Sequence, residues 1–233
     1  MRKTILFIAA ILLSQLVVAQ NFKTVTSPNE NVQFSVFTNP WGVPGYFVIA
    51  EGDTLISDSQ LGLKYSGSEA TGHRIDKVNY RWMQTDTLNN KLYNEMIVTI
   101  LQPYKGTLKV YARAYDNAIA IKQGYVVDSA EKVFLQDDNT CITFSKKSMQ
   151  NGVPVDSLKE ISLPAEFELS NGKVMSVLYS KQEGYPEISL TTVENMSNML
   201  KVNLKPMYEG NDHIVSVQPG SFESPYIYIE IKE

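Results

Sequence analysis

The chain has 233 residues, with 21 Lys and Arg against 25 Asp and Glu, and a formal net charge of −4. This acidic balance argues against nucleic acid as a partner, because binding to phosphates depends on clustered positive charge. Cys141 is the single cysteine, which excludes an intramolecular disulfide. It lies in a strand-like segment and is expected to be a small buried residue. A catalytic thiol is the alternative, although no local signature supports it.

The first 19 residues are predicted to be a secretory signal peptide. Arg2 and Lys3 precede an almost purely apolar run over residues 5–18, and Ala19 suits cleavage before Gln20. An uncleaved membrane anchor is the alternative, but the run is short for a bilayer span of about 20 residues. Cleavage would leave residues 20–233 as one secreted or periplasmic β domain without a transmembrane segment. That domain has 19 basic and 25 acidic residues, a net charge of −6.

From residue 31 onward, apolar and polar residues alternate with the period of β-strands. Residues 32–38 and 46–50 are predicted to be strands joined by a turn rich in Pro and Gly that contains Trp41. Further short strands are expected at residues 54–56, 61–65 and 80–83. Small polar residues between the last two predict a surface loop.

Residues 92–125 form the best-specified segment. Residues 92–101 alternate along a long strand, and residues 102–106 provide turn chemistry before a second strand that ends near Tyr115. Asp116 and Asn117 interrupt the alternation, and a third strand follows. We therefore expect an antiparallel meander with one half-buried face that the flanking strands must cover.

Strand signals continue to the end of the chain. Ser170, Asn171 and Gly172 predict a tight hairpin, and the closing residues 226–231 alternate strongly. Only residues 192–200 could hold a short helix. The sequence therefore predicts an all-β fold, a large antiparallel sandwich.

Several segments together resemble the N-terminal domain of glycoside hydrolase family 97, in order and in spacing, and they cover most of the chain after the leader. They are Ser27-Pro28-Asn29, residues 59–63, Trp82 followed by residues 92–96, residues 108–120, and Asn171-Gly172 leading to residues 185–190.

The resemblance implies a β-super-sandwich of the galactose mutarotase-like kind. In family members this domain precedes a catalytic (β/α)8 barrel. Residues 221–226 resemble the end of the N-terminal domain, and the residues after them are too few for a barrel, which needs roughly 200. We therefore expect a carbohydrate-associated, non-catalytic module that binds glycans or docks to a separate glycosidase barrel.

Two other functions remain open. One is a glycoside hydrolase-related or mutarotase-like enzyme acting on sugars, and the other is an interaction protein without sugar binding. The face that a barrel would cover should either expose an apolar patch or carry polar residues. If the apolar patch is present, we expect a partner or self-association of the chain.

The family's N-terminal domain contributes one Glu to a calcium site, in a strand shortly before the Tyr-Pro pair. Six positions before Tyr185 this chain has Tyr179, and a phenol is a poor calcium ligand. Glu183 is the nearest carboxylate, but its use would shift the strand by four residues. No cofactor is expected, and calcium only if Glu183 replaces the family ligand.

No pair of acidic residues has a recognisable catalytic motif. Glu95 is the strongest single candidate, although a glutamate in a strand is more often solvated or locally hydrogen-bonded. His73 and His213 could form an acid–base pair, but their surroundings predict surface loops.

Sugar binding would use aromatic faces and a few polar groups. The candidate binding residues are Trp41, Trp82, Arg113, Tyr179 and Tyr185, with Tyr208 as a further tyrosine. A structural ion pair is the alternative role for Arg113.

Overall fold

The computed structural model of the chain describes residues 22–87, 90–103, 106–127, 131–207 and 214–232, so the expected signal peptide lies outside the described residues. Within these ranges the chain is built from antiparallel strands and one short 3-10 turn, η1 (Val155–Ser157). The all-β prediction is therefore confirmed. The short helix considered for residues 192–200 is not formed, because turns lead there directly into a strand. No helix in the described residues is long and apolar enough to cross a membrane.

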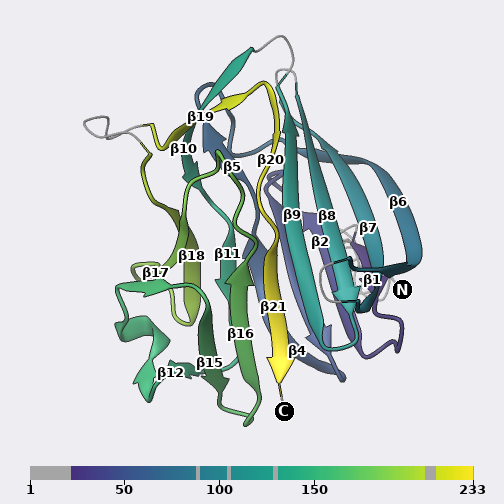
Figure 1. The fold of residues 1–233 in the computed structure, drawn as a ribbon, viewed down its shortest axis with the longest axis vertical. Helices are drawn as coiled ribbons and strands as arrows, with labels where there is room; N and C mark the ends of the chain where they lie inside the picture. Colours follow the sequence, from purple (N-terminus) through teal and green to yellow (C-terminus); the bar gives the residue numbers. More distant parts are fainter. Residues whose placement is uncertain (1–21, 88–89, 104–105, 128–130, 208–213, 233) are drawn as a thin grey trace, which may run out of the picture.

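The predicted meander belongs to a ten-stranded sheet, in which one further strand, β6, lies beyond it at the edge (Figure 1). Its strands are β7 (Leu92–Leu101), β8 (Thr107–Tyr115) and β9 (Ala118–Val126). The register is regular across all three, with Leu101 opposite Thr107 at the first turn. The other strands are β6 (Arg74–Thr85), β12 (Ser148–Gln150), β13 (Val153–Pro154), β15 (Ala165–Leu169), β16 (Val174–Tyr179), β20 (Ser221–Glu223) and β21 (Ile227–Lys232).

Three smaller sheets form a second layer behind the large one (Figure 1). An isolated bridge between Ile56 and Phe144 joins two of them. In the third, the N–H of Asn139 donates to Gly62 O at 2.8 Å and extends the pairing of two of its strands. The sheets contain β1 (Lys23–Thr26), β2 (Val32–Thr38), β3 (Pro44–Ala50) and β4 (Asp53–Gln60); β5 (Leu63–Tyr65), β10 (Lys132–Asp138) and β19 (Ser216–Pro219); and β11 (Cys141–Thr143), β14 (Glu160–Ser162), β17 (Ile188–Thr192) and β18 (Met199–Leu204).

One hydrophobic core fills the space between the two layers. Met96, Val98 and Ile100 on β7 are fully buried in it, as the alternation of this strand predicts. The rings of Phe144 and Phe167 meet across the layers with centroids 5.1 Å apart. Since successive side chains of a strand point to opposite faces, the intervening residues of β7 to β9 lie on the outward face of the large sheet.

Candidate functional site

A row of charged side chains crosses the outward face of the large sheet, and strand register sets its spacing. Arg81 pairs with Glu95 across β6 and β7, and Glu95 pairs with Arg113 across β7 and β8. The Glu95 carboxylate, 2% exposed, accepts a hydrogen bond from Arg81 Nη1 at 3.2 Å and another from Arg113 Nε at 2.9 Å. The ion pair considered for Arg113 is therefore present, and Glu95 is locally hydrogen-bonded.

The Arg113 guanidinium lies between two tyrosine rings. Its central carbon is 4.5 Å from the ring centroid of Tyr93 and 4.2 Å from that of Tyr226. Both contacts are attractive, because a guanidinium over an aromatic face interacts with the ring quadrupole. Beneath it lies a second small hydrophobic cluster, formed by Tyr93, Tyr115, Ala118 and Ala120, with Tyr226 and Tyr228 packed against it.

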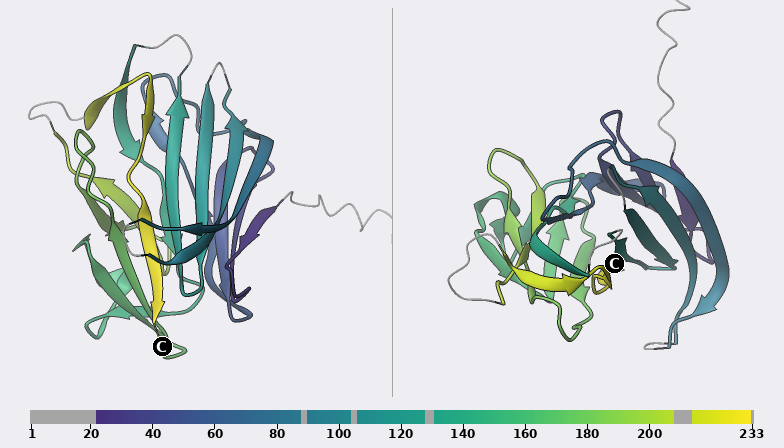
Figure 2. Two further views of the ribbon diagram at one scale, coloured as in Figure 1. Left: turned by 45° about the vertical axis from the view of Figure 1, so that its right-hand side comes forward. Right: turned by 90° about the horizontal axis from the view of Figure 1, so that it is seen from above.

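The end of the β6–β7 hairpin folds across the outward face of the large sheet, as Figure 2 shows. Asp86, 4% exposed, accepts a hydrogen bond from Tyr115 Oη at 2.6 Å and lies 3.9 Å from Arg113 Nη1. Lys91 Nζ reaches Glu230 Oε1 at 3.5 Å on β21, three strands away from β7. Arg113 is thus held from two sides, by Glu95 within the sheet and by Asp86 from the hairpin end.

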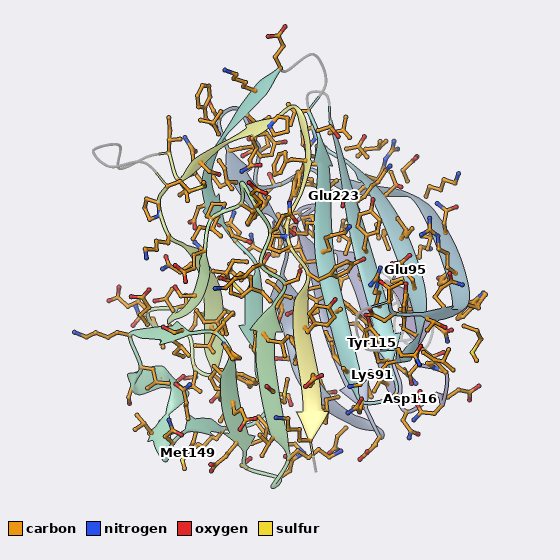
Figure 3. All side chains as sticks on the ribbon, in the orientation of Figure 1. Lys91, Glu95, Tyr115, Asp116, Met149 and Glu223 are labelled. Atoms are coloured by element: carbon orange, nitrogen blue, oxygen red, sulfur yellow. The ribbon has the colours of Figure 1, made fainter. Side chains whose placement is uncertain are left out.

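A second cation extends the row toward β20, near Glu223 in Figure 3. Lys122 forms an ion pair with Glu223, and its ammonium nitrogen lies 4.5 Å from the Tyr111 ring centroid and 4.9 Å from that of Tyr226. Burial, followed by the hydrogen bond with Glu223, raises the pKa of Tyr111 to about 12. We call this surface the tyrosine face. It comprises Tyr111, Tyr226, Tyr228, Arg113 and Lys122, and the rings of Tyr93 and Tyr115 lie buried beside it.

The tyrosine face offers aromatic rings and paired charges. Its central carboxylates, Glu95 and Asp86, are already bonded to Arg113, Arg81 and Tyr115. Acid–base catalysis would need such groups to face a substrate. The two carboxylates therefore hold Arg113 and Tyr115 in place.

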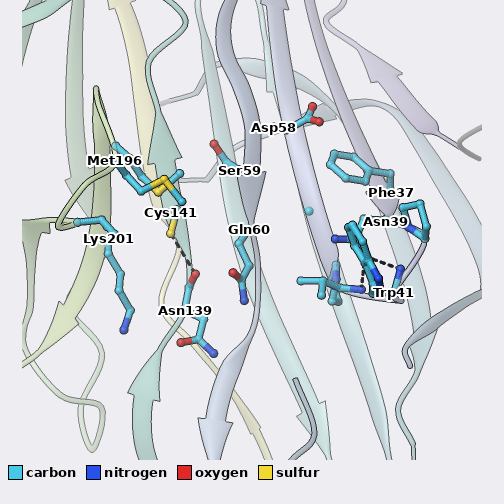
Figure 4. A pocket seen from close by; sticks show the side chains of 16 residues that line it. Phe37, Asn39, Trp41, Asp58, Ser59, Gln60, Asn139, Cys141, Met196 and Lys201 are labelled. Carbon is cyan, nitrogen blue, oxygen red and sulfur yellow. Dashed lines mark hydrogen bonds between the residues drawn. The ribbon is translucent and has the colours of Figure 1, made fainter. Parts of the chain in front are cut away.

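A different feature lies in the second layer, where a cavity of about 660 Å³ opens beside Trp41 (Figure 4). Asp58 and Gln60 on β4 form part of its floor together with Asn139. Trp41 stands on one side and Met196 and Lys201 on the other. Trp41 is 74% exposed, as its place in a turn predicts. The volume lies within the range of about 300–1,000 Å³ that is usual for small-molecule sites.

Two buried groups lie beside this cavity. Cys141 is buried, as predicted, and burial raises the pKa of its thiol to about 11. The thiol therefore stays protonated at neutral pH, which does not suit a nucleophile. Asp138 is 1% exposed, and its Oδ1 accepts a hydrogen bond from the Thr140 N–H at 2.8 Å. Burial raises the pKa of Asp138 to about 6.

The raised pKa of Asp138 predicts a pH-dependent stability. The pKa of Asp138 is higher in the folded than in the unfolded chain, so protonated Asp138 favours the folded state. This contribution to the free energy of unfolding is complete below about pH 4 and is lost as pH rises through about 6. Asp138→Asn removes the charge but keeps an oxygen acceptor for Thr140. Relative to the wild type, this variant should gain up to about 3 kcal/mol of unfolding free energy between pH 4 and pH 8. Urea unfolding at both pH values measures this, and a pH-independent difference would contradict it.

The remaining sequence candidates for ligand binding lie in two places. Trp82 is 53% exposed and stacks on Tyr80 with ring centroids 5.3 Å apart. Tyr179 is half-buried against the core, and Tyr185 is buried with a hydroxyl that has no hydrogen-bond partner among the described residues. Both border a surface hollow of about 240 Å³. The five candidates for ligand binding therefore fall in four separate places.

The candidates for metal binding and acid–base chemistry do not form a cluster. Glu183 is exposed, and the described residues contain no group of three or more His, Cys, Asp and Glu that could hold a metal. His73 is half-buried, and its Nδ1 lies 3.2 Å from Gly42 O. Burial lowers its pKa. His213 and Tyr208 lie outside the described residues.

Sequence reasoning did not identify Asp86, Tyr93 or Tyr226 as part of the site. A signal for Tyr93 exists, because closing the hairpin at residues 102–106 places Tyr93 opposite Tyr115 and Glu95 opposite Arg113. Asp86 and Tyr226 have no such signal, since they reach the face through the folded hairpin end and a distant strand.

Comparisons with known proteins find glycoside hydrolases. A family model described as "Glycosyl-hydrolase 97 N-terminal" matches residues 25–225. A glycoside hydrolase family 97 enzyme from Pseudoalteromonas sp. strain K8, solved in complex with panose, superposes with a TM-score of 0.78 at 17% identity, covering 91% of this chain and 36% of that chain. A β-arabinopyranosidase structure gives 0.74 at 18% identity, with 90% and 40% covered.

A family 36 α-galactosidase from Geobacillus stearothermophilus is more distant, with a TM-score of 0.55, 9% identity, and 90% and 41% of the two chains covered. A search of curated protein sequences gives no match. The chain spans about two fifths of the length of these solved enzymes, and at these identities the structural likeness shows the shared fold.

Proposed function

Since this chain belongs to the family of N-terminal domains of glycosyl hydrolase 97, we propose that it serves as the accessory sandwich of a glycosidase, in a secreted or periplasmic setting, and that a catalytic (β/α)8 barrel covers its tyrosine face. The family resemblance implies the barrel. The greater length of the solved relatives is consistent with a further domain beside the sandwich.

The composition and rigidity of the tyrosine face support this proposal. Tyrosine and arginine are the residues that most often dominate the energetics of protein interfaces. Here Tyr111 and Tyr226 are half-buried. Lys122 contacts both rings, and Arg113 also contacts the ring of Tyr226. A surface whose side chains are already ordered loses less entropy when a partner binds.

Co-expression tests this proposal without requiring the barrel to fold alone. Tagged chain is produced together with the catalytic barrel of the Pseudoalteromonas enzyme, and in a second experiment with that of the β-arabinopyranosidase. We expect at least one barrel to co-purify. Tyr111→Ser should weaken the complex by about tenfold or more, because truncating a central interface tyrosine typically costs more than about 1 kcal/mol.

Tyr80→Ser is the matched control, since Tyr80 is 40% exposed but lies outside the tyrosine face. It should leave the complex intact. If neither barrel co-purifies, or if both variants behave alike, the docking proposal is wrong. Self-association of the chain alone that is lost in Tyr111→Ser would assign the face to a second copy.

A second candidate function is glycan binding by the chain itself. The exposed indole of Trp41 beside a cavity is the observation that favours it.

A further inference from the structure

We infer that the cavity beside Trp41 is a binding site for a neutral oligosaccharide, and that this site is separate from the tyrosine face. The inference rests on the second proposed function, glycan binding, and names its site and its class of ligand.

The first argument is that the exposed indole stands on a rigid turn. Asn39 Oδ1 accepts hydrogen bonds from the N–H of Trp41 at 3.0 Å and of Val43 at 2.9 Å. The Trp41 carbonyl accepts from the Gly72 N–H at 2.8 Å, and the Gly42 carbonyl from the His73 N–H at 2.9 Å. The backbone is fixed on both sides of Trp41 while its side chain is 74% exposed. A fixed, exposed aromatic face is what a pyranose ring needs for stacking.

The second argument is the wall that faces the indole. Met196 is 54% exposed on the opposite side of the cavity, and Met199 lines the same wall. A thioether side chain adapts to irregular apolar surfaces. An oligosaccharide that crosses the cavity would therefore meet apolar surface at Trp41 on one side and at Met196 on the other.

The third argument is the choice of polar groups between these walls. Gln60 and Asn139 line the cavity with carboxamides, each of which carries two N–H donors and one acceptor oxygen. Asn39 adds its two N–H donors, since its Oδ1 already accepts from Trp41 and Val43. Asp58 adds a carboxylate acceptor. Donors and acceptors in this mixture match the hydroxyl groups of a sugar, which both donate and accept.

The charges of the lining argue for a neutral ligand. Among the described residues that line the cavity, Lys201 is the one cation, and its ammonium group is ion-paired with Asp137. Asp58, an exposed carboxylate in the same lining, adds negative charge. The Asp58 carboxylate would repel the negative charge of a uronate or sulfated sugar, and Lys201 is already paired with Asp137.

The position of the cavity makes it independent of docking. Its lining comes from β2, β3, β4, β11, β18 and their connections, and none of it belongs to the ten-stranded sheet that carries the tyrosine face. A barrel on that face would leave the cavity open to a glycan.

Calorimetric titration of the full chain with panose, maltotriose, raffinose and cellotriose tests the inference, with trigalacturonate as the anionic comparison. We expect saturable binding of at least one neutral sugar and weaker binding, or none, of the anion. Trp41→Ala should weaken the binding at least tenfold, and Trp41→Tyr should retain most of it, because a ring remains for stacking.

Trp82→Ala is the matched control, because Trp82 is also an exposed tryptophan, 53% accessible, but lies on β6 away from the cavity lining. It should bind like the wild type, and the melting temperatures of both alanine variants should stay close to that of the wild type. The inference is overturned if no neutral sugar saturates, if binding survives Trp41→Ala, or if trigalacturonate binds best. None of these results alters the outcome for Tyr111→Ser, so docking and glycan binding can fail separately.

Discussion

Replacing Arg113 with alanine should lower the free energy of unfolding by about 3–5 kcal/mol, the usual cost of removing one partner from a buried ion pair. The variant leaves the Glu95 carboxylate, 2% exposed, with Arg81 as its remaining cation. Asp86 loses the same guanidinium, and the rings of Tyr93 and Tyr226 lose the cation between them. Urea unfolding followed by tyrosine fluorescence or circular dichroism measures the change.

Arg81→Ala is the control for this prediction. Arg81 donates to the same carboxylate, but its side chain is 61% exposed, so the loss should stay below about 1 kcal/mol. A double variant, Arg113→Ala with Glu95→Ala, should be more stable than the sum of the two single losses implies, because it removes the stranded charge as well. Equal losses in Arg113→Ala and Arg81→Ala would show that the cluster is not a buried network.

Gly42→Ala should shift the backbone of the turn that holds Trp41, although it does not change the indole itself. Gly42 has φ +74°, and a Cβ at this position would lie 2.6 Å from the His73 backbone nitrogen. The turn must shift to relieve that contact, and the left-handed conformation itself costs about 1–3 kcal/mol for a residue with a side chain. We expect Gly42→Ala to lower oligosaccharide affinity about tenfold, although it leaves the indole in place.

Gly152→Ala separates the two effects. Gly152 has φ +76°, almost the same as Gly42, but a Cβ there would meet nothing within 4 Å. This control should lose some stability and keep its sugar affinity. If Gly42→Ala binds sugar as well as Gly152→Ala does, the rigid turn does not position the indole.

Much of the fold follows from local sequence. The meander of β7, β8 and β9 was predictable because its alternation is long and its turns at residues 102–106 and 116–117 fix the register. The same register places Glu95 opposite Arg113. Trp41 lies in the turn that the Pro and Gly residues predicted, and its side chain is exposed.

The sites themselves depend on contacts that a single sequence does not encode locally. Asp86 reaches Arg113 only because the end of the β6–β7 hairpin folds over the sheet. The cavity beside Trp41 joins Gln60, Asn139 and Met196 from three distant segments. In residues 192–200, where a short helix was considered, turns lead into β18 instead.

Hydroxyl-radical footprinting of the full chain tests the central claim most directly, since it reports the exposure of Tyr, Trp and Met side chains one by one. A co-purified barrel should lower the labelling of Tyr111 and Tyr226, and a bound neutral oligosaccharide should lower that of Trp41 and Met196. Trp82 should stay constant in both cases. The account is contradicted if the barrel and the sugar protect the same residues, or if neither protects the residues assigned to it.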